Sequence, residues 1–245
     1  MKAVIMAAGR GTRISRHIQG KPKCCVEFDG EPIIRRTLRV LKAHGIKDIA
    51  IITGYQSGEV IKAMQPHQAA VFYNPFFDVT NSIASLWFAK EFFSEPDDTI
   101  IINGDLFIED ALLEAIIDEK RSPVFLADST RIEEADYRFV WKDDTLSRYG
   151  KDIPNEETTG EYVGIGKFDK SFFIKFLTKL DEMISSQQSG KWWEDIFYAF
   201  VGTGTRIYVK DIKGVFWAEL DYVEDYNRVI EYLKLDPVTG KSPMD

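Results

Sequence analysis

Apolar and polar positions alternate along the first half of the chain in a way that predicts an α/β fold. Short apolar runs are each followed by a stretch with apolar residues at helical spacing, the pattern of a parallel sheet covered by helices. Three consecutive isoleucines within Thr99–Gly104 indicate a central strand buried on both faces. The expected strands are Lys2–Ala8, Asp48–Thr53, Ala69–Tyr73 and Thr99–Gly104, and the expected helices are Pro32–His44, Gly58–Met64 and Ile83–Phe93.

The pattern is less regular after Asp105. Helices are expected at Glu109–Glu119, Ser171–Ile184, Lys191–Phe200 and Tyr222–Leu233, and strands at Pro123–Ala127, Arg138–Trp141, Tyr162–Phe168, Arg206–Lys210 and Val215–Leu220. The prediction is a Rossmann-like fold: a mixed, mainly parallel sheet with helices on both faces. One domain should span residues 1–235, and 236–245, with two prolines and a glycine, should form a tail or linker.

Charge restricts the kind of partner. A formal net charge of −8 argues against general nucleic-acid binding, yet seven basic residues fall between Arg10 and Arg36 and form a local site for anions. No apolar run is long enough for a signal peptide or a membrane span, so we expect a cytoplasmic protein. The adjacent pair Cys24 and Cys25 is assigned to packing. The sequence leaves the oligomeric state open, a homodimer included.

A glycine-rich loop follows the first strand. Its sequence is Ala7-Ala8-Gly9-Arg10-Gly11-Thr12-Arg13, in which the glycines let backbone N–H groups approach phosphate oxygens and Arg13 adds fixed charge. There is no third glycine as in dinucleotide-binding proteins and no Gly-Lys-Ser/Thr ending as in P-loops. The loop alone is a weak signal.

Two further segments make the signal specific: Lys21-Pro22-Lys23, and then Gly30-Glu31-Pro32-Ile33-Ile34. The whole stretch resembles the signature of the nucleoside-diphosphate-sugar pyrophosphorylase superfamily of nucleotidyltransferases. The resemblance implies that Arg13 and Lys23 act in catalysis on a bound triphosphate. It also implies that the loop binds the nucleotide through Ala7, Ala8, Gly9, Gly11 and Thr12.

Two acidic residues stand at strand ends. Asp105 follows the strand that ends at Gly104, itself expected at the nucleotide, and Asp221 follows Val215–Leu220. Ligands bind at the carboxyl edge of open α/β sheets, and two carboxylates there can share one Mg²⁺ with phosphate oxygens. The superfamily has its metal ligands in matching contexts, so the resemblance implies that both bind Mg²⁺. Asp221 would alternatively make a good N-cap for the following helix.

The nucleotide is inferred from the segment that begins at Asn74-Pro75. Sugar-specific relatives have Gln-Pro and a glycine-rich turn there, whereas this chain continues to Thr80-Asn81-Ser82-Ile83 and a Ser-Leu helix. That segment is similar to the cytidylyltransferase branch, which includes phosphocholine, aminoethylphosphonate and inositol-phosphate enzymes. The similarity favours CTP, with Asn81 and Ser82 as nucleotide-binding residues. Asn81 could instead merely cap the helix.

The acceptor is inferred from carboxylates beside aromatic rings, the groups that bind ammonium ions by ion pairing and cation–π attraction. The candidates are Glu161, Trp192, Glu194 and Asp195, and Lys151 could reach the acceptor phosphorus. The resemblance is to the phosphocholine and aminoethylphosphonate branch. A simpler alternative is that the tryptophans fill the core, the acids are solvated and the lysine is a surface residue.

Three functions remain in competition. The leading hypothesis is a magnesium-dependent cytidylyltransferase that joins CMP from CTP to phosphocholine, 2-aminoethylphosphonate or a similar compound and releases pyrophosphate. The second is a sugar-phosphate or inositol-phosphate nucleotidyltransferase, which would need polar groups for hydroxyls. The third is a nucleotide sensor without catalysis, and the retention of Arg13, Lys23, Asp105 and Asp221 together argues against it.

Overall fold

A nine-stranded twisted sheet forms the centre of the computed structural model, which describes residues 1–235. The predicted tail at 236–245 lies outside the described residues. The strand order is β5-β4-β1-β6-β11-β8-β12-β10-β9. Strands β5, β4, β1 and β6 are mutually parallel, as expected for the first half of the chain. The second half is more mixed than expected, because only β12 and β8 pair in parallel there.

The main-sheet strands are β1 Lys2–Ala7, β4 Asp48–Thr53, β5 Ala70–Tyr73, β6 Thr99–Asn103, β8 Val124–Asp128, β9 Arg138–Lys142, β10 Thr145–Gly150, β11 Gly160–Phe168 and β12 Tyr208–Asp211. Two small two-stranded sheets pair β2 Glu27–Phe28 with β3 Glu31–Pro32 and β7 Leu106–Phe107 with β13 Ala218–Glu219. The α-helices are α1 Ile33–Ala43, α2 Ser57–Ala63, α3 Ser82–Phe88, α4 Asp110–Asp118, α5 Phe173–Ser185, α6 Asp195–Tyr198 and α7 Val223–Leu233. Short 3₁₀ helices lie at Lys23–Cys25, Lys90–Phe93 and Asn155–Glu157. No helix in the described chain is both long and apolar enough to cross a membrane.

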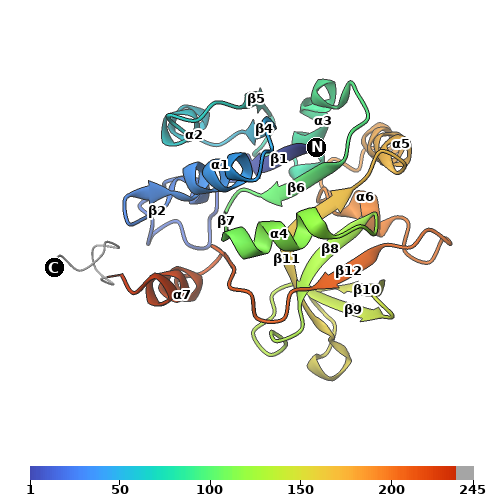
Figure 1. Ribbon diagram of the computed structural model, residues 1–245. Helices are drawn as coiled ribbons and strands as arrows, with labels where there is room; N and C mark the ends of the chain where they lie inside the picture. Colours follow the sequence, from blue (N-terminus) through green and yellow to red (C-terminus); the bar gives the residue numbers. More distant parts are fainter. Residues whose placement is uncertain (236–245) are drawn as a thin grey trace.

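Helices cover both faces of the sheet (Figure 1). Side chains alternate along each strand, so neighbouring residues of β1 enter different cores: Ile5 packs with α1, α2 and α4, whereas Val4 packs on the other face with α3, α5 and α6. The central strand is buried on both faces as predicted, with Ile100, Ile101 and Ile102 fully inaccessible. This arrangement leaves the carboxyl ends of β1 and β6 together at one edge of the sheet.

A third apolar cluster holds the C-terminal helix against the segment that follows β1. Val229 and Ile230 of α7 pack with Ile14, Phe28 and Phe107. The backbone N–H of Leu220 also donates to the carbonyl of Asp105 (3.1 Å). Segments that are far apart in the sequence are thereby fixed beside the loop that follows β1.

Several predicted elements need correction. The expected strand at Val215–Leu220 is reduced to β13, which pairs with β7 outside the main sheet. The expected helix at Lys191–Phe200 is only α6, because the carboxylate of Asp195 accepts the N–H of Trp192 (2.8 Å) and forms a turn there. Strand β10 was not predicted, since its largely exposed sequence lacks the apolar alternation of a core strand. The helix expected at Ile83–Phe93 is divided into α3 and a 3₁₀ turn.

Candidate active site

A cavity of about 350 Å³ opens at the carboxyl ends of β1 and β6. Its size is in the range typical of small-molecule sites. One end is formed by the loop after β1, and the other by aromatic side chains from β11 and the segment around α6. The predicted site residues that line it are Ala7, Ala8, Gly9, Gly11, Arg13, Lys23, Asn81, Ser82, Gly104, Asp105, Lys151, Trp192, Glu194 and Asp221. Thr12, Glu161 and Asp195 lie outside the lining.

The glycines that line the cavity have different roles. A Cβ on Gly9 would meet nothing within 4 Å, so its backbone is open to a ligand. Gly11 has φ of +60°, and a Cβ there would lie 2.5 Å from Lys23 Cγ. Gly104 N–H donates to the carbonyl of Met6 (2.9 Å), and a Cβ would lie 2.6 Å from that oxygen. Glycine is therefore required at 11 and 104 because the chain itself approaches closely.

Lys23 forms hydrogen bonds to both predicted metal ligands. Its Nζ donates to Asp105 Oδ2 (2.8 Å) and to Asp221 Oδ1. Arg13 Nη1 donates to the other oxygen of Asp221 (2.6 Å). Burial disfavours the charged form of Lys23, but the charges of Asp105 and Asp221 outweigh burial and raise its pKa above the ordinary lysine value. The residues that sequence analysis singled out for catalysis and metal binding therefore meet at one point.

Glu219 brings a third carboxyl group to this point and was not predicted. Burial first, and then the charges of Asp105 and Asp221, raise its pKa well above that of an ordinary glutamate. Asn103 Nδ2 donates to its Oε1 (2.9 Å). Glu219 ends β13 two residues before the predicted Asp221, and this proximity along the chain was the signal that could have identified it.

The donor set fits a hard divalent cation. Mg²⁺ typically takes one or two protein carboxylates and completes its octahedron with water and substrate phosphates. Asp105 and Asp221 supply two carboxylates beside the open loop. Residues 1–235 contain no group of three or more His, Cys, Asp or Glu side chains that could hold a metal ion by themselves.

The predicted base-binding residues already have partners within the protein. Asn81 caps α3, accepting the N–H of Ser82 (2.8 Å) with its side-chain oxygen. Ser82 Oγ accepts the backbone N–H of Trp193 (2.9 Å). Both residues nevertheless line the cavity. The capping alternative thus describes the geometry of Asn81, and a role in base recognition stays a prediction.

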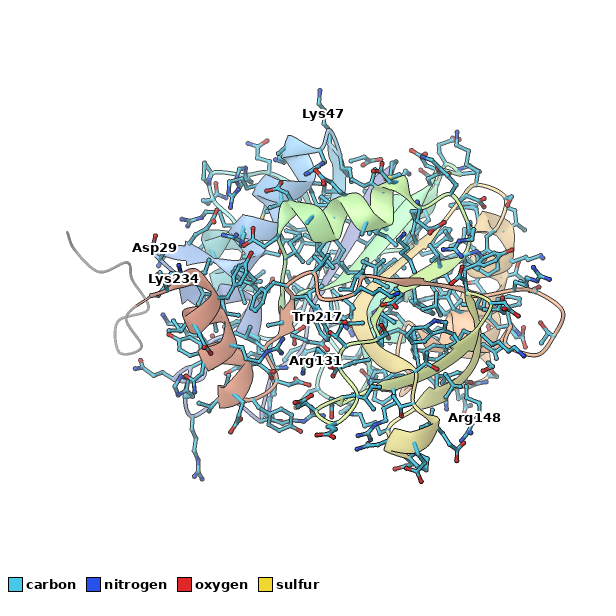
Figure 2. The ribbon with its side chains drawn as sticks, turned by 60° about the horizontal axis from the view of Figure 1, so that its bottom comes forward. Asp29, Lys47, Arg131, Arg148, Trp217 and Lys234 are labelled. Carbon is cyan, nitrogen blue, oxygen red and sulfur yellow. The ribbon has the colours of Figure 1, made fainter. Side chains whose placement is uncertain are left out.

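Glu161 faces away from the cavity, contrary to expectation. It is 5% exposed, and its carboxylate accepts from Arg131 Nε (2.5 Å) and from the backbone N–H of Asp136 (2.7 Å). Strand alternation turns the next residue, Tyr162, toward the cavity instead. Arg131 lies over the ring of Trp217, and the two are side by side in Figure 2. Glu161 therefore positions the segment that leads to Asp136.

Asp136 connects two basic side chains of the cavity lining. Its carboxylate accepts from Lys151 Nζ (2.7 Å) and lies 3.7 Å from Arg13 Nη1. The predicted Lys151 is thereby held at the cavity, within one charge network with Arg13. Asp136 was missed because it belongs to an irregular connection between β8 and β9 with no sequence motif.

The other end of the cavity is an aromatic pocket around Glu194. Burial is the main cause that raises the pKa of Glu194 to about 8. Trp192 lines this pocket and is 42% exposed, whereas Trp193 is 1% exposed and donates from Nε1 to Asn103 Oδ1 (2.9 Å). One tryptophan thus fills the core and the other contacts the cavity. The pocket also contains three tyrosines that were not predicted: Tyr137, Tyr162 and Tyr198.

Comparison with known proteins agrees with this architecture. Residues 3–146 match the family model described as the MobA-like NTP transferase domain. The CTP:phosphoglutamine cytidylyltransferase of Campylobacter jejuni is 24% identical over 94% of this chain and 100% of its own length. The choline-phosphate cytidylyltransferase of Streptococcus pneumoniae is 26% identical over 96% and 99%. The solved structure of CTP:phosphocholine cytidylyltransferase from Streptococcus pneumoniae has a TM-score of 0.78 at 23% identity, and the match covers 95% of this chain and 98% of that one, which confirms the predicted fold.

Proposed function

The chain belongs to the family of MobA-like NTP transferase domains, and from that premise we propose that it is a magnesium-dependent cytidylyltransferase. It transfers CMP from CTP to a small phosphate or phosphonate that carries an ammonium group, and pyrophosphate is released. One observation carries the proposal: a single cavity joins a cationic phosphate site to a buried carboxyl group among aromatic rings. The two sequence relatives compared above are named as cytidylyltransferases of phosphorylated acceptors.

The proposed reaction needs charge neutralisation more than proton transfer. An anionic oxygen of the acceptor attacks the α-phosphorus of CTP, and the bond from that phosphorus to the bridging oxygen of the β-phosphate breaks. The acceptor oxygen already carries the electron pair, so no general base is required. Lys23 and Arg13 offset the charge of two anions brought together, an effect that depends on their fixed positions. Their carboxylate partners hold them in place before substrate binds.

Asp105 and Asp221 are the residues proposed to hold Mg²⁺. When bound, the cation would neutralise phosphate charge and orient the triphosphate. The same carboxylates hold Lys23, so the lysine keeps the pair from repelling each other in the protein without metal. The pKa of the neighbouring Glu219 is raised, first by burial and then by the charges of these two carboxylates.

The two charged groups of the acceptor match two parts of the cavity lining. Lys151, held by Asp136, provides a cation for the phosphorus group. Glu194 provides the carboxylate for an ammonium group, and Trp192 provides an accessible aromatic ring beside it. An ammonium group can pair with the ionised form of Glu194, whereas a neutral sugar offers it no charge, so the observations favour an ammonium-bearing acceptor over a sugar phosphate.

A pyrophosphate-release assay tests the proposal. The four nucleoside triphosphates are each combined with phosphocholine, 2-aminoethylphosphonate, glucose 1-phosphate or inositol 1-phosphate, with Mg²⁺ present. Turnover is expected with CTP and an amino acceptor, and a Lys23→Met variant serves as the inactive control. Turnover only with glucose 1-phosphate or inositol 1-phosphate would overturn the acceptor assignment. If no pair of nucleotide and acceptor gives turnover, the nucleotide-sensor hypothesis would be favoured.

A further inference from the structure

Two hydroxyl groups in the aromatic pocket lack a partner. The Oη atoms of Tyr162 and Tyr198 are buried and have no partner in good hydrogen-bonding geometry, although the first lies next to the carboxyl group of Glu194 and the second next to the hydroxyl of Tyr137. The two side chains are 6% and 3% exposed, and both line the cavity. Buried hydroxyls are nearly always paired, because leaving one unsatisfied is costly. These two oxygens therefore indicate polar groups on the ligand.

The carboxyl group of Glu194 lies beside these hydroxyls. The Tyr162 hydroxyl faces it, and its charge acts on Tyr198. Glu194 forms no ion pair within residues 1–235, whereas the three basic side chains that line the cavity are each held by an aspartate. Burial is the main cause that raises the pKa of both tyrosines, so they stay protonated. The pocket thus offers one carboxyl group and tyrosine hydroxyls, and no basic side chain of the described residues pairs with Glu194.

Both tyrosine rings stack on other aromatic rings of the protein. Tyr162 stacks on Phe139, with centroids 5.1 Å apart and planes 22° apart. Tyr198 stacks on Tyr149 at 3.9 Å and 12°. A quaternary ammonium is normally held by several aromatic faces at once. Here at least one face of each ring is used by the protein, and the unpaired atom that each side chain brings to the cavity is an oxygen.

We propose that the ammonium group of the acceptor is a primary one, with N–H bonds, and not a trimethylammonium group. This inference rests on the proposed function and narrows its acceptor class. A primary ammonium has three N–H donors, which can go to Glu194, Tyr162 Oη and Tyr198 Oη. A trimethylammonium group has none and would leave both hydroxyl oxygens unpaired. Sugar hydroxyls could pair with the tyrosines but would leave the carboxylate without a counter-charge.

The test uses two acceptors that differ only in three methyl groups, phosphoethanolamine and phosphocholine. Their kcat/KM values are measured with CTP and Mg²⁺ by pyrophosphate release. The full-length protein should prefer phosphoethanolamine by at least about tenfold, the factor that one hydrogen bond to a charged group provides. Tyr162→Phe and Tyr198→Phe should raise the KM for phosphoethanolamine and leave that for phosphocholine nearly unchanged. Tyr149→Phe, which changes a hydroxyl outside the cavity lining, is the matched control.

The outcomes separate the inference from the function on which it rests. Equal or better turnover of phosphocholine would overturn the inference and leave the cytidylyltransferase intact. If both cavity Tyr→Phe variants keep the wild-type ratio of the two kcat/KM values, the inference is also overturned. A purely structural role of the tyrosines would lower kcat/KM for both acceptors together. Silence with both acceptors, or activity with glucose 1-phosphate alone, would overturn the acceptor class and the inference with it.

Discussion

The side chain of Lys23 crosses directly over the backbone of Gly11, so that a Cβ on Gly11 would lie 2.5 Å from Lys23 Cγ and 2.8 Å from its Cε. The glycine therefore makes room for the lysine stem. Since Lys23 Nζ reaches Asp105 and Asp221 from this position, the conformation of the loop controls where the positive charge lies.

Gly11→Ala should move this charge. The new Cβ would also strain a backbone with φ of +60°, at a cost of about 1 kcal/mol. A displacement of about 1 Å in a catalytic group can lower the rate by about a hundredfold. We expect kcat to fall by about that factor with a smaller change in the KM for CTP, measured by pyrophosphate release. Gly58→Ala, at an open position on α2, should keep wild-type activity.

Asp221→Asn should weaken metal dependence. Asp221 holds both Lys23 and Arg13 and is a proposed ligand of Mg²⁺. The variant should need at least about tenfold more Mg²⁺ for half-maximal rate, and chelation with EDTA should abolish the wild-type activity reversibly. The control is Asp110→Asn on α4, whose carboxylate is 59% exposed and pairs with His44. Full wild-type activity in EDTA would contradict the metal assignment.

Acceptor binding should depend on pH through Glu194. Its pKa is raised to about 8, mainly by burial and further by the charge of Asp195. Below that pH the free protein holds the neutral acid, so binding an ammonium group must first release the proton. The acceptor KM should fall by up to about tenfold per pH unit from pH ~6 to ~8 and then level off.

Glu194→Gln is the matched variant for this titration. It should bind the acceptor weakly, and any remaining pH dependence should come from the acceptor phosphorus group, which both proteins share. The same raised pKa means that the wild-type free energy of unfolding falls as pH rises between the ordinary glutamate pKa and about 8, because the native state binds more protons there. Thermal unfolding of Glu194→Gln should lack this decline.

Substitution of Glu161 should lower stability as well as acceptor binding, whereas substitution of Lys151 should affect acceptor binding alone. Glu161→Ala leaves Arg131 Nε and the N–H of Asp136 without their acceptor, so it should destabilise the fold by about 2 kcal/mol and raise the acceptor KM. Lys151→Ala breaks an ion pair whose side chains are 37% and 41% exposed, which contributes under about 1 kcal/mol. It should raise the acceptor KM with little change in thermal unfolding. Equal destabilisation by both would contradict this division.

The sequence by itself determined where the candidate site lies and most of the sheet. Gly9, Gly11, Arg13 and Lys23 were identified by a local motif, and the expected strands in the first half of the chain agree closely with β1, β4, β5 and β6. Local motifs are readable because a loop that wraps phosphate needs particular residues at fixed spacing. Asp105 was found for a related reason, since it directly follows an apolar strand.

Only the tertiary structure decided which side chains face the cavity. Glu161 and Tyr162 are adjacent on β11, and alternation requires that they point to opposite faces, but it does not say which face holds the site. Asp136 and Glu219 reach the cavity through an irregular connection and a two-residue strand, neither of which carries a motif. The unpaired oxygens of Tyr162 and Tyr198 follow from ring packing among residues distant in sequence. Spacing along a chain specifies local geometry, whereas burial and pairing depend on every segment that folds against it.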